Sequence, residues 1–157
     1  MLGLLVLSAC SASKFKTYRG PAVTQILIDK SDRRMWLFHN QTVLKEYKVE
    51  LGFAPVGHKQ FEGDGRTPEG LYYIDRRNPN SRFHLSLGIS YPNAADRAYA
   101  RERGKSPGGD IFIHGGPDLR KWFGKKDWTW GCIAVKDREM ETIYSMVGKG
   151  TAVYIRP

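Results

Sequence analysis

The alternation of apolar and polar residues near the start of the chain is the feature that most restricts its fold. Three consecutive segments show this pattern, Val23–Asp29, Arg34–Asn40 and Thr42–Leu51, and they are joined by turns at Lys30–Arg33 and Asn40–Gln41. A period of two residues is typical of strands that bury one face, and short polar turns connect antiparallel neighbours. The sequence therefore predicts that the domain opens with a β-meander.

Later segments add further strands to this sheet. Apolar or alternating residues occupy Leu71–Asp75, Phe83–Tyr91, Asp110–Gly116 and Thr151–Ile155. Cys132–Val135 is a shorter apolar segment, and the Gly- and Pro-rich stretch between Gly52 and Gly70 is typical of a loop.

One helix is indicated clearly near the C-terminus. Its apolar residues, Met140, Ile143, Tyr144 and Val147, follow the spacing i, i+3, i+4, i+7. We expect Asp137 to be its N-cap and Gly148 to follow its last turn. Ala94–Arg103 can form a short helix, and Asp118–Phe123 a single helical turn. Because strands and helices do not alternate, the prediction is a mostly β, β-rich mixed α+β domain and not a doubly wound parallel sheet.

Length and charge restrict the class of protein. A chain of 157 residues is large enough to bury one core without disulfides. The net charge of +9 favours contact with polyanions, such as nucleic acid, anionic lipid or an anionic cell-wall polymer, although a solvated basic surface explains it equally well. The basic residues are scattered and no nucleic-acid-binding motif is present, so we expect no nucleic-acid partner.

The first residues are typical of an export signal. The apolar run Leu2–Leu7 is too short to span a membrane, and it is followed by Ser8, Ala9 and Cys10. Leu7–Cys10 resembles the bacterial lipobox, in which the cysteine becomes a diacylated N-terminus, although no basic residue precedes it. We therefore expect a signal peptide over residues 1–9, a lipidated N-terminus and tether over 10–20, and the folded domain over 21–157. A buried first strand is the alternative.

Cys132 and His114 are the residues best suited to chemistry. A thiol becomes a strong nucleophile when a nearby base accepts its proton, and each of these residues lies at the end of an apolar segment beside glycine. Backbone N–H groups of the Gly131–Cys132 turn can stabilise an oxyanion. A buried cysteine and a structural histidine, or a Cys10–Cys132 disulfide, remain alternatives. No cluster of ligands has the spacing of a metal site, so we expect neither metal nor cofactor.

Three ordered motifs carry a resemblance to a known family. The first has two parts: IHGG, which contains His114, and TWGCIAV, which begins after the fourteen residues that follow His114. The second is RTPEGLYYI at Arg66–Ile74, and the third is the opening strand pair Ile26–Asn40. Together they resemble the catalytic domain of the L,D-transpeptidases (YkuD type), over about Val23–Ile155. Two positions depart from the family pattern: Trp130 replaces the usual histidine before Gly-Cys, and Ala134 replaces a frequent arginine or asparagine.

The resemblance implies a YkuD-like β-sandwich or barrel with one C-terminal helix. It also implies that Cys132 attacks the bond between the diamino acid and D-alanine in a tetrapeptide stem of peptidoglycan, and that the acyl group passes to an amine of another stem or of a wall-linked protein. His114 would be the general base, oriented by the backbone carbonyl of Gly115, and Gly131 would contribute to the oxyanion site.

Supporting residues and alternatives follow from the same resemblance. Thr129, Trp130, Arg66 and Arg120 are expected to contact the substrate. A carboxypeptidase or amidase of the same fold, or a wall-binding module without catalysis, is the alternative function. The expected location is the periplasm or cell envelope, with membrane contact only through the lipid on Cys10.

Overall fold

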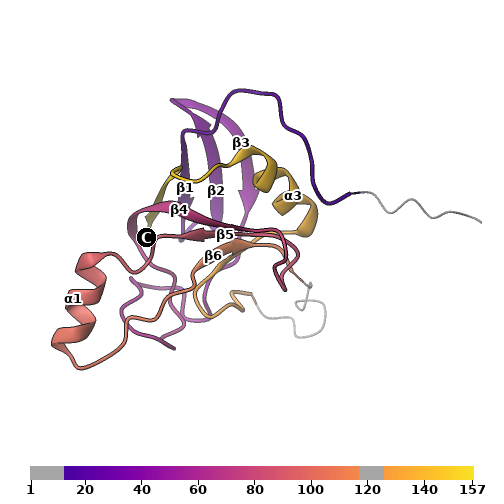
Figure 1. The fold of residues 1–157 in the computed structure, drawn as a ribbon. Coiled ribbons are helices and arrows are strands. Elements are labelled where there is room, and N and C mark those ends of the chain that lie inside the picture. Colours follow the sequence, from indigo (N-terminus) through magenta and orange to yellow (C-terminus); the bar gives the residue numbers. More distant parts are fainter. Residues whose placement is uncertain (1–12, 117–125) are drawn as a thin grey trace, which may run out of the picture.

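The computed structural model describes residues 13–116 and 126–157 of the chain (Figure 1). Strands dominate it, which confirms the predicted mostly β class. The strands are β1 (Gln25–Asp29), β2 (Arg34–His39), β3 (Thr42–Lys48), β4 (Gly70–Asn78), β5 (Ser86–Ile89), β6 (Phe112–His114), β7 (Ile133–Ala134) and β8 (Ala152–Arg156). The described helices are α1 (Ala94–Glu102) and α3 (Asp137–Met146).

The strands form one curled, mixed sheet of eight, in the order β3-β2-β1-β8-β4-β5-β6-β7. The predicted meander is present, because β1 pairs with β2 and β2 with β3 in antiparallel fashion. Two pairs are parallel, β1 with the C-terminal β8, and β6 with β7. In Figure 1, β1–β3 run across the direction of β5 and β6, so the sheet curls around its own core.

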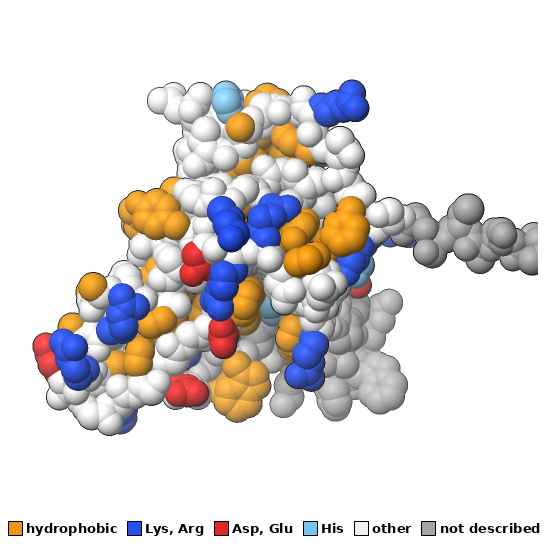
Figure 2. All heavy atoms as spheres, viewed as in Figure 1, with side chains coloured by type: hydrophobic (Ala, Val, Ile, Leu, Met, Phe, Trp, Pro, Cys, Tyr) orange, Lys and Arg blue, Asp and Glu red, His pale blue; other side chains and the backbone are white. Residues whose placement is uncertain are grey.

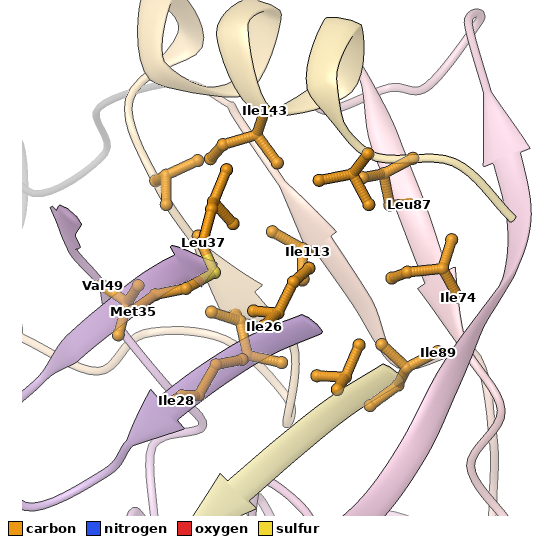
Figure 3. Close-up of a cluster of buried hydrophobic side chains, with 14 of the residues drawn as sticks. Ile26, Ile28, Met35, Leu37, Val49, Ile74, Leu87, Ile89, Ile113 and Ile143 are labelled. Carbon is orange, nitrogen blue, oxygen red and sulfur yellow. The ribbon is translucent and has the colours of Figure 1, made fainter. Parts of the chain in front are cut away.

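The core lies on the concave face of this sheet. Alternate residues of β1, β2, β4 and β8 are fully buried, such as Ile26 and Ile28 of β1 and Leu37 of β2. Figure 3 shows Ile143 of α3 pointing from the helix toward the apolar side chains of the sheet, which include Ile113 of β6. The predicted helix therefore closes the core with its apolar stripe.

The helix boundaries refine the sequence prediction. The N-cap of α3 is Lys136 and not Asp137, which is the first helical residue. The short helix expected at Ala94–Arg103 is α1, and its Asn93 and Asp96 exchange capping hydrogen bonds. The structure therefore has a second described helix besides the expected C-terminal one. The helical turn expected at Asp118–Phe123 lies outside the described residues.

Several predicted strands are shorter in the structure, and two of them show a tertiary reason. The segment Thr42–Leu51 forms β3 only as far as Lys48, after which Glu50 forms an isolated antiparallel bridge with Ala134. The apolar segment Cys132–Val135 contributes just two residues to β7. The chain leaves the meander here because it pairs with a strand that comes more than eighty residues later in the sequence.

The N-terminal segment lies against the domain without forming a helix or strand over residues 13–20. Lys16 forms an ion pair with Glu141 of α3, and the Lys14 ammonium donates to the carbonyl of Pro79. Cys10 and the expected signal peptide lie outside the described residues. Within the described ranges, no helix is long and apolar enough to cross a membrane.

Candidate active site

The paired strands β6 and β7 position His114 and Cys132 on one face of the sheet. Ile113 is in register with Ile133, and His114 with Ala134. Ile113 and Ile133 point into the core and are fully buried. Because side chains alternate along a strand, His114, Ala134 and Cys132 lie on the opposite face. The apolar residues of these short strands therefore orient the two polar ones.

Cys132 is a free, partly buried thiol. Its sulfur accepts a hydrogen bond from the amide of Phe112 at 3.4 Å, and its S–H group points to the carbonyl of Asp110 at 3.5 Å. Burial raises the pKa of the thiol above its ordinary value, and this effect outweighs the bond from Phe112, which lowers the pKa. The resting group is therefore the thiol and not the thiolate.

His114 is almost completely buried, with 3% of its surface exposed. Its Nδ1 lies 2.5 Å from the carbonyl oxygen of Gly115, and since a carbonyl can only accept, Nδ1 carries the proton. Burial lowers the pKa of the imidazole, although the bond to Gly115 works in the opposite direction. The ring is therefore neutral at rest, and Nε2 is free of a proton and able to accept one.

Two aromatic rings hold the imidazole of His114. The ring of Phe83 stacks on it with centroids 4.5 Å apart and an interplanar angle of 31°. Trp128 contacts it edge-on, at 5.8 Å and 72°. This packing restricts rotation of the ring and explains its burial.

The turn before Cys132 is held by the hydroxyl of Thr129. This group donates to the carbonyl of Cys132 at 2.7 Å and accepts from the amide of Gly131 at 3.1 Å. Thr129 was expected to contact substrate, but its side chain is 4% exposed and is used inside the turn. The amide of Gly131, expected to stabilise an oxyanion, already has this partner in the structure.

Gly131 is required at its position for steric reasons. Its φ of +129° lies in a region that side chains disfavour, and a Cβ atom would approach the carbonyl oxygen of Arg66 to 2.6 Å. A Cβ on Gly52 would lie 2.0 Å from the carbonyl oxygen of Gly65 and 3.1 Å from Gly131 Cα. Three glycines that are distant in sequence thus allow the loop after β3 to pack directly against the cysteine turn.

That loop is anchored by polar groups that sequence reasoning did not identify. The buried ammonium of Lys30 binds the carbonyls of Gly57 and Thr67 and the carboxylate of Glu69, at 2.6, 3.0 and 2.7 Å. At a second point, His58 Nε2 lies 2.9 Å from the carboxylate of Asp96 in α1. The only sequence signal for Lys30 was its place in a turn, which gives no indication of burial.

The rim of the site is aromatic. Trp130 is 70% exposed and meets the ring of Phe53 edge to face, with centroids 5.0 Å apart. Of the residues expected to bind substrate, Trp130 is therefore accessible, and it lies two positions before Cys132 in the sequence. The backbone of Arg66 borders Gly131, while its guanidinium lies next to Gly57. Arg120 lies outside the described residues.

A cavity of about 580 Å³ adjoins β7, and neither Cys132 nor His114 lines it. Ala134, Glu50 and Asp127 are among the residues that line it. In the described ranges, no three His, Cys, Asp or Glu side chains are grouped so that they could hold a metal ion.

Comparison with known proteins identifies the family. A model of the YkuD family, described as the L,D-transpeptidase catalytic domain, matches residues 24–155. A curated protein of Escherichia coli K12 named "Putative L,D-transpeptidase YafK" is 30% identical over an alignment of 166 residues. That alignment covers 99% of this chain but 60% of YafK, so the chain spans less than two thirds of its curated relative.

Solved structures agree in fold. The helical cell shape determining protein Pgp2 of Campylobacter jejuni is 28% identical, with a TM-score of 0.64 over 88% of this chain and 49% of that one. Bd1075 of Bdellovibrio bacteriovorus is 25% identical, with a TM-score of 0.61 over 86% of this chain and 48% of that one. With the family match over nearly all of the described fold, these findings show that the chain belongs to the YkuD family of L,D-transpeptidase catalytic domains.

Proposed function

We propose that the protein is a peptidoglycan L,D-transpeptidase that uses Cys132 as its nucleophile and His114 as its general base. The observation that carries this proposal is that Cys132, directly before β7, bonds to Phe112 of β6, the strand that ends in His114. Nδ1 of His114 is bonded to Gly115, so that Nε2 is the proton acceptor. Membership of the family supports the choice of reaction. The substrate, a peptide stem of peptidoglycan, is also part of this proposal.

The first half-reaction starts from a neutral thiol and a neutral imidazole. His114 Nε2 takes the proton of Cys132 as the sulfur attacks the carbonyl carbon between the diamino acid and D-alanine of a tetrapeptide stem. When the tetrahedral intermediate collapses, the C–N bond breaks and the imidazolium returns its proton to the leaving amine of D-alanine. Because both pKa shifts disfavour an ion pair at rest, the thiolate forms only as attack begins.

The second half-reaction transfers the acyl group from sulfur. An acceptor amine attacks the thioester, gives a proton to His114, and the thiol of Cys132 is regenerated when that proton returns to the leaving sulfur. For the oxyanion, we propose the amide of Cys132 as the main donor, because the amide of Gly131 already donates to Thr129. The exposed ring of Trp130 is the proposed contact for the substrate at the rim.

We further propose that the protein works in the cell envelope. The net charge of +9 suits an anionic wall polymer, and Figure 2 shows Lys and Arg side chains spread over the face of β4–β6 and along α1, with Asp and Glu among them. The lipobox-like Leu7–Cys10 supports a lipid anchor, and the relative Pgp2 is described as determining cell shape. Labelling with palmitate in cells tests the anchor.

The test of the reaction is incubation of the full chain with tetrapeptide muropeptides, followed by mass spectrometry of protein and products. A transpeptidase gives a thioester adduct on Cys132 and cross-linked dimers. Loss of D-alanine without dimers identifies the carboxypeptidase instead. Folded protein that gives neither adduct nor product contradicts the catalytic proposal and favours a wall-binding module.

A further inference from the structure

Asp137 contacts the loop that follows His114. As the first residue of α3, it was expected to cap its own helix, but its Oδ1 accepts a hydrogen bond from the amide of Gly116 at 2.7 Å. The two residues are 21 positions apart in the sequence. A carboxylate acceptor makes such a bond shorter and stronger than a neutral one.

The amide that Asp137 holds belongs to the same peptide unit that orients His114. The peptide bond between Gly115 and Gly116 presents its carbonyl to His114 Nδ1 at 2.5 Å and its N–H group to Asp137. A peptide unit is planar and almost always trans, so fixing the N–H group fixes the direction of the carbonyl. A negative charge on the N–H side also polarises the carbonyl toward oxygen, which makes it a better acceptor.

The surroundings leave this peptide unit little freedom. A Cβ on Gly115 would lie 2.5 Å from Asp137 Oδ1, and a Cβ on Gly116 would lie 2.8 Å from the ring of Phe83. Phe83 is also the residue that stacks on the imidazole of His114. The two glycines are thus enclosed between Phe83 and Asp137, and only residues without side chains fit there.

We propose that Asp137 is a positioning residue for His114 and acts through the Gly115–Gly116 peptide unit. The carboxylate holds the N–H group, the carbonyl holds Nδ1–H, and Nε2 is left without a proton as the acceptor. The arrangement does the work of an orienting carboxylate in a catalytic triad, with one peptide group interposed. The assignment rests on the proposed function for the role of His114, but the tautomer it fixes can be measured directly.

The decisive measurement is the tautomer of His114 by long-range ¹⁵N–¹H NMR of the full chain. The native protein is expected to show the Nδ1–H form, because Nδ1 lies 2.5 Å from the carbonyl oxygen of Gly115. Asp137→Ala shifts the population toward Nε2–H, because the carbonyl is no longer held, whereas Asp137→Asn keeps an Oδ1 acceptor and the native tautomer. A native tautomer in a folded Asp137→Ala protein overturns the proposal.

Turnover of muropeptides gives a second readout. Misplacement of a catalytic group by about 1 Å can cost on the order of 10²-fold in rate. We expect Asp137→Ala to lower kcat by at least about tenfold with little change in KM, and Asp137→Asn to restore most of it. The Gly115 bond raises the pKa of His114, so its loss in Asp137→Ala moves the acid limb of the pH–rate profile to lower pH. Equal losses in Ala and Asn, with an unmoved acid limb, contradict the proposal.

The controls separate this role from a structural one. Glu139 is a matched residue in the first turn of α3 and accepts from the amide of Lys136 at 3.0 Å, so Glu139→Ala weakens the helix start without touching the glycine loop. It is expected to keep the native tautomer. The other titratable or charged groups on the elements around His114 are Cys132, the His84–Glu141 pair, and Arg138, Glu139 and Tyr144 of α3. The Asp137 variants leave all of them unchanged, and the control changes Glu139 alone.

The test still gives an answer if Asp137→Ala does not fold, and also if the native protein shows no turnover. If Asp137→Ala does not fold, the native protein still decides the question, because the Gly116 amide must be protected from hydrogen exchange and its shift must follow the titration of the Asp137 carboxylate. An unprotected amide with no such response overturns the proposal. If native protein turns over no muropeptide while the tautomer responds as expected, the proposed function fails and the positioning role of Asp137 stands.

Discussion

The meander β1–β3 and the turn that carries Cys132 are built on opposite principles. In the meander, β1 and β2 bury alternate side chains, and strands that are neighbours in sequence pair along their backbones. In the turn, the strand is two residues long, and side chains bond to backbone groups, as when Thr129 holds both Gly131 and Cys132. The comparison teaches that burial stabilises the fold, whereas a few polar contacts position the chemistry.

The largest effect on activity is expected at the cysteine turn, with little effect on the fold. Cys132→Ala removes the proposed nucleophile and should reduce muropeptide turnover to background. His114→Ala should lose about 10²–10⁴-fold, which is the usual contribution of a general base. Both variants should melt within a few degrees of the native protein. Full activity of Cys132→Ala contradicts the cysteine mechanism.

The converse effect is expected in the meander. Leu37 is fully buried in β2, so Leu37→Ala should lower the free energy of unfolding by about 2–5 kcal/mol, measured by urea denaturation. Activity per folded molecule should stay close to native. Leu71 is the matched control, since it is 52% exposed on β4 and its change to Ala should stay within about 0.5 kcal/mol. Equal losses at both positions mean that the core is not where the structure places it.

At Thr129 we expect a smaller effect, which lowers both the stability of the protein and its activity. Thr129→Val keeps the shape of the side chain but leaves the carbonyl of Cys132 and the amide of Gly131 without their partner. Each such buried group costs about 1–3 kcal/mol, and the displaced turn should also lower kcat. Thr129→Ser retains the hydroxyl and should behave like the native protein. If Val and Ser variants are equally active, the hydroxyl does not position the turn.

The smallest effect is a displacement of the pH profile. Burial lowers the pKa of His114 below its ordinary value of 6.5, so the base stays unprotonated, and turnover should fall only below about pH 6.5. Burial raises the pKa of Cys132 above 9.0, so alkylation of the thiol by iodoacetamide in the His114→Ala protein should keep rising beyond pH 9. A plateau of alkylation near neutral pH indicates a thiolate at rest and contradicts the neutral pair.

Sequence patterns were sufficient for the elements that depend on local spacing. The alternation over Val23–Asp29 and Arg34–Asn40 predicted β1 and β2, and the apolar spacing from Met140 to Val147 predicted α3. Sequence patterns predicted strand ends and helix caps less accurately where a segment distant in the chain pairs with the same residues. The strand expected to reach Leu51 stops at Lys48, because Glu50 pairs with Ala134. Asp137, expected to cap its own helix, bonds to Gly116 instead.

The sequence alone determined the mostly β class and the closing helix, since these follow from periodicity. It also led to Cys132 and His114 as the proposed catalytic pair, through three ordered motifs that resemble the YkuD family. The tertiary structure decided which groups are already bonded and which are free to act. In the folded protein, the hydroxyl of Thr129 donates to the carbonyl of Cys132, and the buried ammonium of Lys30 donates to the carbonyl of Thr67 in the loop after β3. Such pairings join residues far apart in the chain, and no local pattern encodes them because hydrogen bonding and burial are decided by the neighbours that folding brings together.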